Sequence, residues 1–308
     1  MSLFSRLPRV QASRSLGVFP FFGWMLFFFV VPFGFVVIDS LAKRGTYGGV
    51  VFDSLGLANY VRAFDPIYAT IFARSLQLAG TTTFFCLVFG FPMAWLIALS
   101  PKRFHTLLLL AVVVPFWTNF IVRVYAVKVL VSTEGPLQAI LQALQIPILP
   151  ESFSTGPFAV MLGMVTNYLP FMVLPIWVSI EKFDFTLLEA ARDLGASRLN
   201  AFRRVLLPQV LPGVLSGMTF VFTPALGEFV IPDLLGGART LLIGNLVTEQ
   251  FLKARDWPFG AALSVLLIAC VVGFLWVAQL ASKRSRLSFQ LLRWRNHQKN
   301  DEGVRGTT

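Results

Sequence analysis

Six long apolar runs, separated by shorter polar segments, dominate the sequence. A transmembrane α-helix needs about 20 consecutive, mostly apolar residues to cross the hydrocarbon core of a bilayer, so each run predicts one membrane span. Prolines interrupt several of the runs, which neighbouring helices tolerate in a bundle. The predicted spans are approximately Leu16–Ile38, Leu76–Leu99, Phe104–Val131, Pro157–Ile180, Gln209–Val230 and Pro258–Leu280.

One polar segment, residues 186–208 (TLLEAARDLGASRLNAFRRVLLP), has the pattern of two short helices joined by a sharp turn. Thr186 followed by Glu189 predicts a capping box at the start of the first helix. Gly195 stands where a left-handed C-terminal cap is needed, and Ser197 suits the N-cap of the second helix. The proline that closes the segment is predicted to end that helix. The segment is too polar to cross a bilayer and too short to form a domain.

Composition supports a membrane protein. Hydrophobic residues make up 56% of the 308 residues and charged residues only 13%, and the mean hydropathy is +0.72. A soluble protein of this length needs more charge to cover its surface. The predicted fold is therefore all-α, a polytopic bundle of six transmembrane helices.

The distribution of Lys and Arg predicts the orientation of this bundle. With six spans, both termini lie on the same side of the membrane, and 17 of the 26 Lys and Arg residues lie on that side. Cytoplasmic loops carry an excess of Lys and Arg, so this side is predicted to be cytoplasmic. The basic balance of +11 thus indicates topology, and a nucleic-acid partner is not expected.

The predicted organisation has three parts. Residues 1–15 form a cytoplasmic N-terminal segment, residues 16–282 form the six-span domain, and residues 283–308 form a basic cytoplasmic tail. The domain includes one cytoplasmic loop of note, residues 181–208. A basic tail of this kind is typical of a stop-transfer anchor at the lipid surface.

Motifs of catalysis are missing from the sequence. No Gly-rich loop is followed by Lys and Ser or Thr, so the chain has no motif of its own for binding a nucleoside triphosphate. The two histidines, His105 and His297, are far apart in the sequence and predict no metal site or general base. Cys86 and Cys270 lie inside apolar runs and predict neither a disulfide nor a metal site. We expect no catalytic residues, no metal and no cofactor bound by this chain.

The 181–208 loop resembles the EAA loop of ABC importer permeases. The resemblance rests on Glu189-Ala190-Ala191, on Gly195 four residues later, and on Val205-Leu206-Leu207-Pro208 after nine more residues. The family usually has Ile where this chain has Val205. In that family the loop forms coupling helices that dock in a groove on the ATP-hydrolysing subunit. The resemblance implies docking roles for Glu189, Ala190, Ala191, Asp193, Gly195, Arg198, Phe202 and Pro208. An ordinary pair of surface helices is the alternative.

Further segments resemble the permeases for spermidine and putrescine, and more narrowly the first of the two permease subunits of such systems. They are VPFWTNFIVRVYA (114–126), LPFMVLPIW (169–177), LEAARDLGAS (188–197), GEFVIPDLLGG (227–237), LLIGN (241–245) and RDWPFGAA (255–262). The resemblance implies the type I ABC importer permease fold in a bacterial inner membrane. It also implies a second permease subunit, two ATP-binding subunits that hydrolyse ATP, and an external polyamine-binding protein.

Two carboxylates near the end of the fifth run are candidate pathway residues. Glu228 and Asp233 could pair with the ammonium groups of a polyamine, since an ionisable group in or near a span marks a pathway by default. Aromatic faces could hold the same groups by cation–π attraction. The aromatic candidates are Phe229, Trp117, Tyr125 and Trp177. Alternatively, the aromatic residues serve packing or the interfacial belt, and Glu228 forms a salt bridge with Arg123 or a partner chain.

The sequence leaves two other functions open. An importer permease for another solute, such as an iron chelate, an anion or thiamine, has the same loop; an anion, however, favours basic rather than acidic pathway residues. An ion-coupled secondary transporter or channel subunit would act without partners. A secondary transporter or channel subunit of this kind would leave the 181–208 loop without a function.

Overall fold

The computed structural model describes residues 10–145, 155–237 and 240–305, with side chains from residue 20 to residue 282. Residues 1–9 of the predicted N-terminal segment and the side chains of the predicted basic tail lie outside this description. Two compact units make up the chain. One contains α1 (Val10–Leu41), the ribbon of β1 (Lys43–Arg44) and β2 (Val50–Val51), and α2 (Ala58–Ala63). It also contains the later part of α13 (Ile243–Leu252) and the first ten residues of α14 (Trp257–Arg305).

Unit 1 is held together where α14 begins. The Arg62 guanidinium forms a salt bridge of 2.7 Å with the buried carboxylate of Asp256 and lies 4.0 Å from the ring centre of Phe259. Arg44 donates to the carbonyl oxygen of Ala254 at 2.7 Å, which ties the ribbon to the same turn. By contrast, α1 exposes nearly all of its apolar side chains from residue 20 onward, as expected of a helix that faces lipid or another chain.

Unit 2 is a bundle around three long helices, α3 (Pro66–Leu99), α8 (Pro157–Glu181) and α11 (Leu207–Gly227), which pack on one another. Glycines permit the close approach. A Cβ at Gly90 of α3 would lie 2.9 Å from the Met172 Cγ of α8, and one at Gly217 of α11 would lie 2.8 Å from its sulfur. Small residues commonly allow such contacts between membrane helices. The fully buried Met172 side chain therefore lies where all three helices meet.

The third predicted span, Phe104–Val131, is not one continuous helix. It is divided into α4 (Lys102–Trp117) and α5 (Phe120–Val131), and the axis bends by 94° at the break. Pro115 lacks the N–H that would continue the helix, and Thr118 is extended. The Asn119 side chain then caps α5 by accepting from the Ile121 N–H at 2.9 Å. The break thus has local causes, in three residues of the segment 115–119.

Four of the other predicted spans correspond to single helices, with extended bounds. Helices α1, α3, α8 and α14 all contain a stretch long and apolar enough to cross a membrane. The fifth predicted span, Gln209–Val230, begins earlier and ends at Gly227. The described chain thus has five such helices, or six with the bent pair counted as one.

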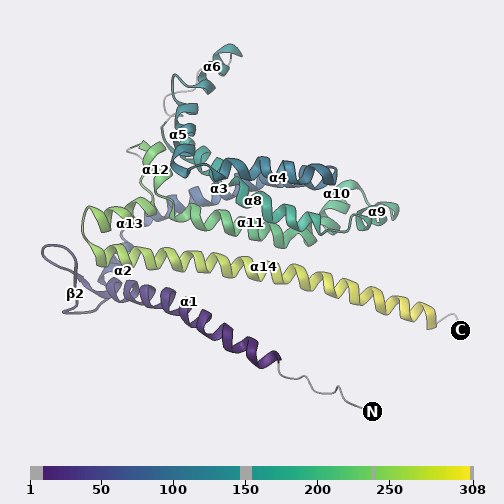
Figure 1. The fold of residues 1–308 in the computed structure, drawn as a ribbon, viewed down its shortest axis with the longest axis horizontal. Helices are drawn as coiled ribbons and strands as arrows, with labels where there is room; N and C mark the ends of the chain where they lie inside the picture. The colour runs from purple at the N-terminus through teal and green to yellow at the C-terminus, as the bar shows by residue number, and fades with distance from the viewer. Residues whose placement is uncertain (1–9, 146–154, 238–239, 306–308) are drawn as a thin grey trace. The chain divides into compact units, whose positions relative to one another are not determined.

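Three of the segments that separate the predicted spans contain secondary structure in their described parts. They include the β1–β2 ribbon, α2, α6 (Pro136–Ala143), α12 (Val230–Leu235) and α13. Figure 1 shows that, within unit 2, α5 and α12 lie at one end of α8 and α11, and α9 (Thr186–Asp193) and α10 (Arg198–Ala201) lie at the other.

Candidate functional site

The 181–208 loop forms the two helices that the sequence predicts, with one correction at its start. The capping box does not form: Phe185 occupies the N-cap position without a side-chain bond. Instead, the Asp184 carboxylate accepts from the Thr186 backbone N–H at 3.0 Å and from its hydroxyl at 2.7 Å. Asp184 satisfies the first turn from outside the helix, so Glu189 is exposed and unconstrained by a cap.

Gly195 closes α9 as predicted. Its φ is +84°, the Gly195 N–H bonds to the Arg192 carbonyl and the Ala196 N–H bonds to the Ala191 carbonyl. These two bonds form a Schellman motif. Ser197 then caps α10, accepting from the Asn200 N–H at 3.3 Å.

The second helix does not end at Pro208, contrary to the prediction. After α10 the chain passes through a π-helical turn, η1 (Phe202–Leu206), and continues directly into α11. The Leu207 N–H bonds to the carbonyl of Phe202, five residues earlier. Pro208 falls in the first turn of α11, where a missing N–H is tolerated. The loop is therefore continuous with a membrane span.

Aromatic side chains connect the loop to α3. The Phe202 ring lies 5.8 Å from Phe91 and 6.4 Å from Trp95, and the Phe185 ring lies 6.1 Å from Trp95. A cavity of about 440 Å³ lies beside them, lined in part by Leu188 and Arg192. The loop is thus packed on the bundle at its two ends.

The surface of the loop carries apolar side chains that no described residue of the chain covers. Leu194 is 89% exposed, Leu199 is 62% exposed and Leu187 is 40% exposed. Of the eight residues predicted for docking, the exposed ones are Glu189, Ala190, Asp193, Gly195 and Arg198, whereas Ala191, Phe202 and Pro208 are half-buried. An exposed apolar patch rimmed by charged residues is typical of a protein–protein contact.

Glu228 directly follows the end of α11 at Gly227, in agreement with its predicted place near the end of the fifth run. Its carboxylate accepts from the hydroxyl of Tyr168, which lies 13 residues before the end of α8 at Glu181. At 1.5 Å per residue, Tyr168 is roughly 20 Å along α8 from the loop end of the bundle. Glu228 is only 9% exposed. A buried carboxylate among apolar helices is a candidate pathway residue.

Both oxygens of the Glu228 carboxylate accept hydrogen bonds from residues of this chain. Oε1 accepts from the backbone N–H groups of Phe229, Val230 and Ile231 at 3.1, 2.9 and 3.3 Å, and Oε2 accepts from Tyr168. The fifth span ends here, since α11 ends at Gly227 and the short helix α12 begins at Val230. Glu228 therefore satisfies the orphan N–H groups of α12 and ties this turn to α8.

Arg123 does not pair with Glu228, so that predicted alternative is wrong for the described residues. The guanidinium instead donates through Nε to Asn167 Oδ1 at 2.9 Å and through Nη1 to the Pro115 carbonyl at 3.1 Å. It also lies 4.7 Å from the ring centre of Phe116. Arg123 thus holds the break between α4 and α5 on neutral oxygens and leaves the negative charge of Glu228 uncompensated within the described chain.

Four of the other predicted pathway residues lie on α4, α5 or at α12. Trp117 lies at the break of the third span and Phe229 just after the end of the fifth, and they are 75% and 44% exposed. Asp233 is exposed on α12, one turn after Phe229. Tyr125 is half-exposed on α5, but the Lys128 Nζ already lies 5.9 Å from its ring centre.

Trp177 lies apart from these residues, in contrast to the prediction. It is four residues before the end of α8, and its ring lies 6.3 Å from that of His105, at the start of α4. The His105 Nδ1 is in turn 3.5 Å from Glu181 Oε2. Trp177 is therefore about 14 Å along α8 from Tyr168, near the loop end of the bundle.

Three polar residues that sequence reasoning did not single out complete the arrangement: Asn167, Tyr168 and Asn245. Asn167 also donates to the Gly163 carbonyl at 2.8 Å, which fixes its amide, and Asn245 donates to the Phe229 carbonyl at 2.9 Å. Both asparagines stand inside otherwise apolar strings, and a polar side chain in such a run was the available signal.

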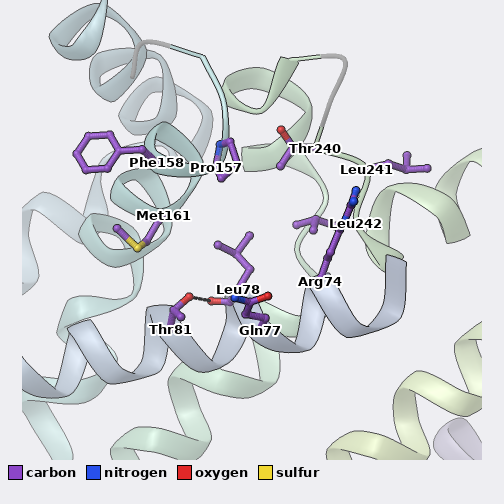
Figure 2. Close-up of a pocket in the computed structure, with 10 residues that line it drawn as sticks. All are labelled: Arg74, Gln77, Leu78, Thr81, Pro157, Phe158, Met161, Thr240, Leu241 and Leu242. Atoms are coloured by element: carbon purple, nitrogen blue, oxygen red, sulfur yellow. Dashed lines mark hydrogen bonds between the residues drawn. The ribbon is translucent and has the colours of Figure 1, made fainter. Parts of the chain in front are cut away.

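A larger cavity of about 830 Å³ lies between α3, the start of α8 and residues 240–242 (Figure 2). Leu78, Met161 and Leu242 are among its mostly apolar lining, and Arg74 extends along one side. No carboxylate lines it among the described residues. A cavity with a cation and no acid does not suit a cationic solute.

Comparison with known proteins decides the family. Residues 13–286 match the family described as "Binding-protein-dependent transport system inner membrane component". The chain belongs to this family of ABC importer permeases. The permease is 44% identical over 247 residues to the spermidine/putrescine transport system permease protein PotB of Escherichia coli, covering 80% of this chain and 89% of that protein. It is 39% identical to PotB of Haemophilus influenzae, covering 85% and 91%.

Solved structures agree on the fold of the permease. A bacterial ABC transporter involved in the import of the acidic polysaccharide alginate matches with a TM-score of 0.65 and 19% identity, covering 89% of this chain and 95% of that one. The MetNI methionine ABC transporter matches with a TM-score of 0.53 and 18% identity, covering 72% and 99%. The predicted type I ABC importer permease fold is thereby confirmed.

Proposed function

We propose that this permease subunit moves polyamines, such as putrescine and spermidine, inward across the bacterial inner membrane. The carrying observation is the 44% identity, across most of both chains, with a permease named for spermidine and putrescine transport. The buried Glu228 at the end of the fifth span supports this assignment independently, because a carboxylate suits a cationic solute.

The substrate pathway is proposed to run past the break of the third span and the end of the fifth. Glu228 and Asp233 supply negative charge for ammonium groups, and Phe229 and Trp117 supply exposed aromatic faces at the same two places. Cation–π attraction adds to the ion pairs and the rings also pack against methylene groups. Tyr125 is a less suitable aromatic face because the Lys128 ammonium lies over its ring. Trp177 lies near the loop end of the bundle, away from the other aromatic candidates.

Energy for transport is proposed to come from two ATP-hydrolysing subunits that dock on the 181–208 loop. The uncovered side chains of Leu187, Leu194 and Leu199 provide the apolar contact, and Glu189 and Arg198 provide charge at its rim. A second permease subunit and an external binding protein complete the complex. ATP binding would move the loop as a rigid body and open the bundle outward, and hydrolysis would return it.

The orientation proposed for this complex follows from charge. The 181–208 loop and both termini face the cytoplasm, because 17 of the 26 Lys and Arg residues lie on their side. The α5–α12 end then faces outward and receives substrate from the binding protein. We propose that the chain itself binds no cofactor, since ATP would bind to the partner subunits.

Uptake by reconstituted complexes tests the pathway. Complexes of the permease with its partner subunits, loaded with ATP, are expected to take up radiolabelled putrescine or spermidine. Asp233→Asn should lower the initial rate by up to about fivefold, because one exposed ammonium–carboxylate pair of up to about 1 kcal/mol is lost. The matched control is Asp65→Asn, which removes another exposed acid and should transport normally. Unchanged uptake by Asp233→Asn would remove this residue from the pathway, and no polyamine uptake by the parent complex would refute the function.

A further inference from the structure

Two neighbouring residues of α8 hold the third and the fifth span. Asn167 binds the guanidinium of Arg123, which follows the break in the third span, and Tyr168 binds the carboxylate of Glu228, which stands at the end of the fifth. All four side chains come from runs that are otherwise mostly apolar. The break and the span end therefore share one anchoring point, near the middle of α8.

The two oxygens of Glu228 have different partners. Oε1 serves the N-terminus of α12 through three backbone N–H groups, whereas the one hydrogen bond of Oε2 within the described chain is to the Tyr168 hydroxyl. A hydrogen bond to a buried carboxylate is stronger than one between neutral groups. The start of α12 is thus tied to α8 by a single side-chain bond, at an oxygen that has no other donor.

Packing and one backbone hydrogen bond hold the rest of α12 against the first half of α8. Gly163 of α8 lets Ile231 and Leu235 approach closely, and the Gly156 N–H donates to the Leu235 carbonyl at 2.9 Å. None of these contacts involves a charge. Of the contacts named between α12 and α8 in the described chain, only the Tyr168–Glu228 bond involves a charged group, so it is the contact that a charged solute could change.

We propose that Tyr168 is a latch, a positioning residue that keeps α12 closed on α8 until a substrate ammonium replaces its hydroxyl at Glu228 Oε2. This inference rests on the proposed function and adds a role to the same site. An ammonium N–H is a charged donor and outcompetes a neutral phenol for a carboxylate oxygen. Asn167 supports the latch by accepting from Arg123, a cation of the third span that would otherwise compete for Glu228. Substrate entry and release of α12 are then one event.

The latch predicts how ATP hydrolysis depends on substrate. In the empty complex the Tyr168 bond opposes outward opening, so hydrolysis without substrate is slow. Removing a bond to a charged group shifts such an equilibrium by roughly tenfold. Tyr168→Phe in the assembled complex should raise basal ATPase activity roughly tenfold, leave the rate with saturating spermidine-loaded binding protein close to the parent value, and lower the spermidine imported per ATP.

A matched variant separates the latch from a general loss of packing. Tyr60→Phe removes another tyrosine hydroxyl, which bonds to Ser40 Oγ at 2.7 Å in unit 1, and should leave the ratio of basal to stimulated ATPase unchanged. If Tyr168→Phe does not assemble, Glu228→Gln carries the test, because it keeps the side chain's size and weakens the bond. That variant should raise basal ATPase and also lose spermidine uptake, since it removes the acceptor charge.

Two results would overturn the latch. One is a Tyr168→Phe complex that assembles, imports spermidine and has the parent's ratio of basal to stimulated ATPase. The other is an equal rise in that ratio for Tyr60→Phe. Failure of the proposed function is a separate result, in which the parent complex hydrolyses ATP but imports neither putrescine nor spermidine.

Discussion

At the scale of single residues, Gly195 shows how one backbone angle determines the shape of the 181–208 loop. Its φ of +84° is in the left-handed region, and a Cβ placed there would meet nothing within 4 Å. The requirement for glycine is therefore conformational and does not come from packing. Sequence reasoning could predict this residue because a Schellman motif is a local pattern of a few residues.

A pair of substitutions at Gly195 tests this requirement. Gly195→Val should destabilise the turn by about 1–2 kcal/mol, since a side chain with a branched Cβ strongly disfavours positive φ, and should abolish ATP-driven uptake. Gly195→Asn should retain most uptake, because Asn tolerates the left-handed region. Insertion into the membrane should be normal for both, as measured by the amount of protein in the membrane fraction. Equal uptake by the Val variant and the parent would contradict a rigid loop that transmits movement.

Glu228 and Tyr168 mark the limit of residue-level prediction. The acid could be found because charge is rare in apolar runs, and its role in a pathway is still a prediction. The burial of Glu228 and its bond to Tyr168 could not be found, because 60 residues separate the two side chains in sequence. Only the packing of α8 against α11 brings them together. Asp184 was missed for a different reason: two adjacent capping solutions compete, and the sequence pattern of both is present.

At the scale of elements, the length of the apolar runs predicted the number of spans but not their continuity. Run length locates membrane helices well because hydrocarbon thickness fixes it. The break between α4 and α5, and the π-helical passage from α10 into α11, depend on which backbone groups find side-chain partners from other helices. That information lies outside the run itself.

Arg123 is expected to stabilise the α4–α5 break. Arg123→Met keeps the contact with the Phe116 ring but leaves the amide oxygen of the buried Asn167 without its donor. Each buried polar group left unpaired costs about 1–3 kcal/mol, so we expect a lower unfolding temperature in detergent. Lys128→Met, which removes a cation on the same helix, is the control and should change it little. Equal unfolding temperatures for the two variants would exclude a structural role for Arg123.

At the scale of the whole molecule, the charge count predicts which side of the membrane each loop faces. A test uses single cysteines in a background without Cys86 and Cys270. Ser197→Cys should react with a membrane-impermeant maleimide only after the inner membrane is opened, whereas Tyr47→Cys, at a 98% exposed position between β1 and β2, should react in intact spheroplasts. The reverse labelling pattern would invert the topology and with it the direction of the docking surface.

The central claim is that this chain moves polyamines only as part of an ATP-driven complex. The most direct measurement compares uptake of radiolabelled spermidine by proteoliposomes that hold the permease alone with uptake by those that hold it with the second permease, the ATPase subunits and the binding protein. We predict uptake only by the complete complex, dependent on ATP and reduced by competing putrescine. Uptake of spermidine by the permease alone, without ATP, would contradict this account.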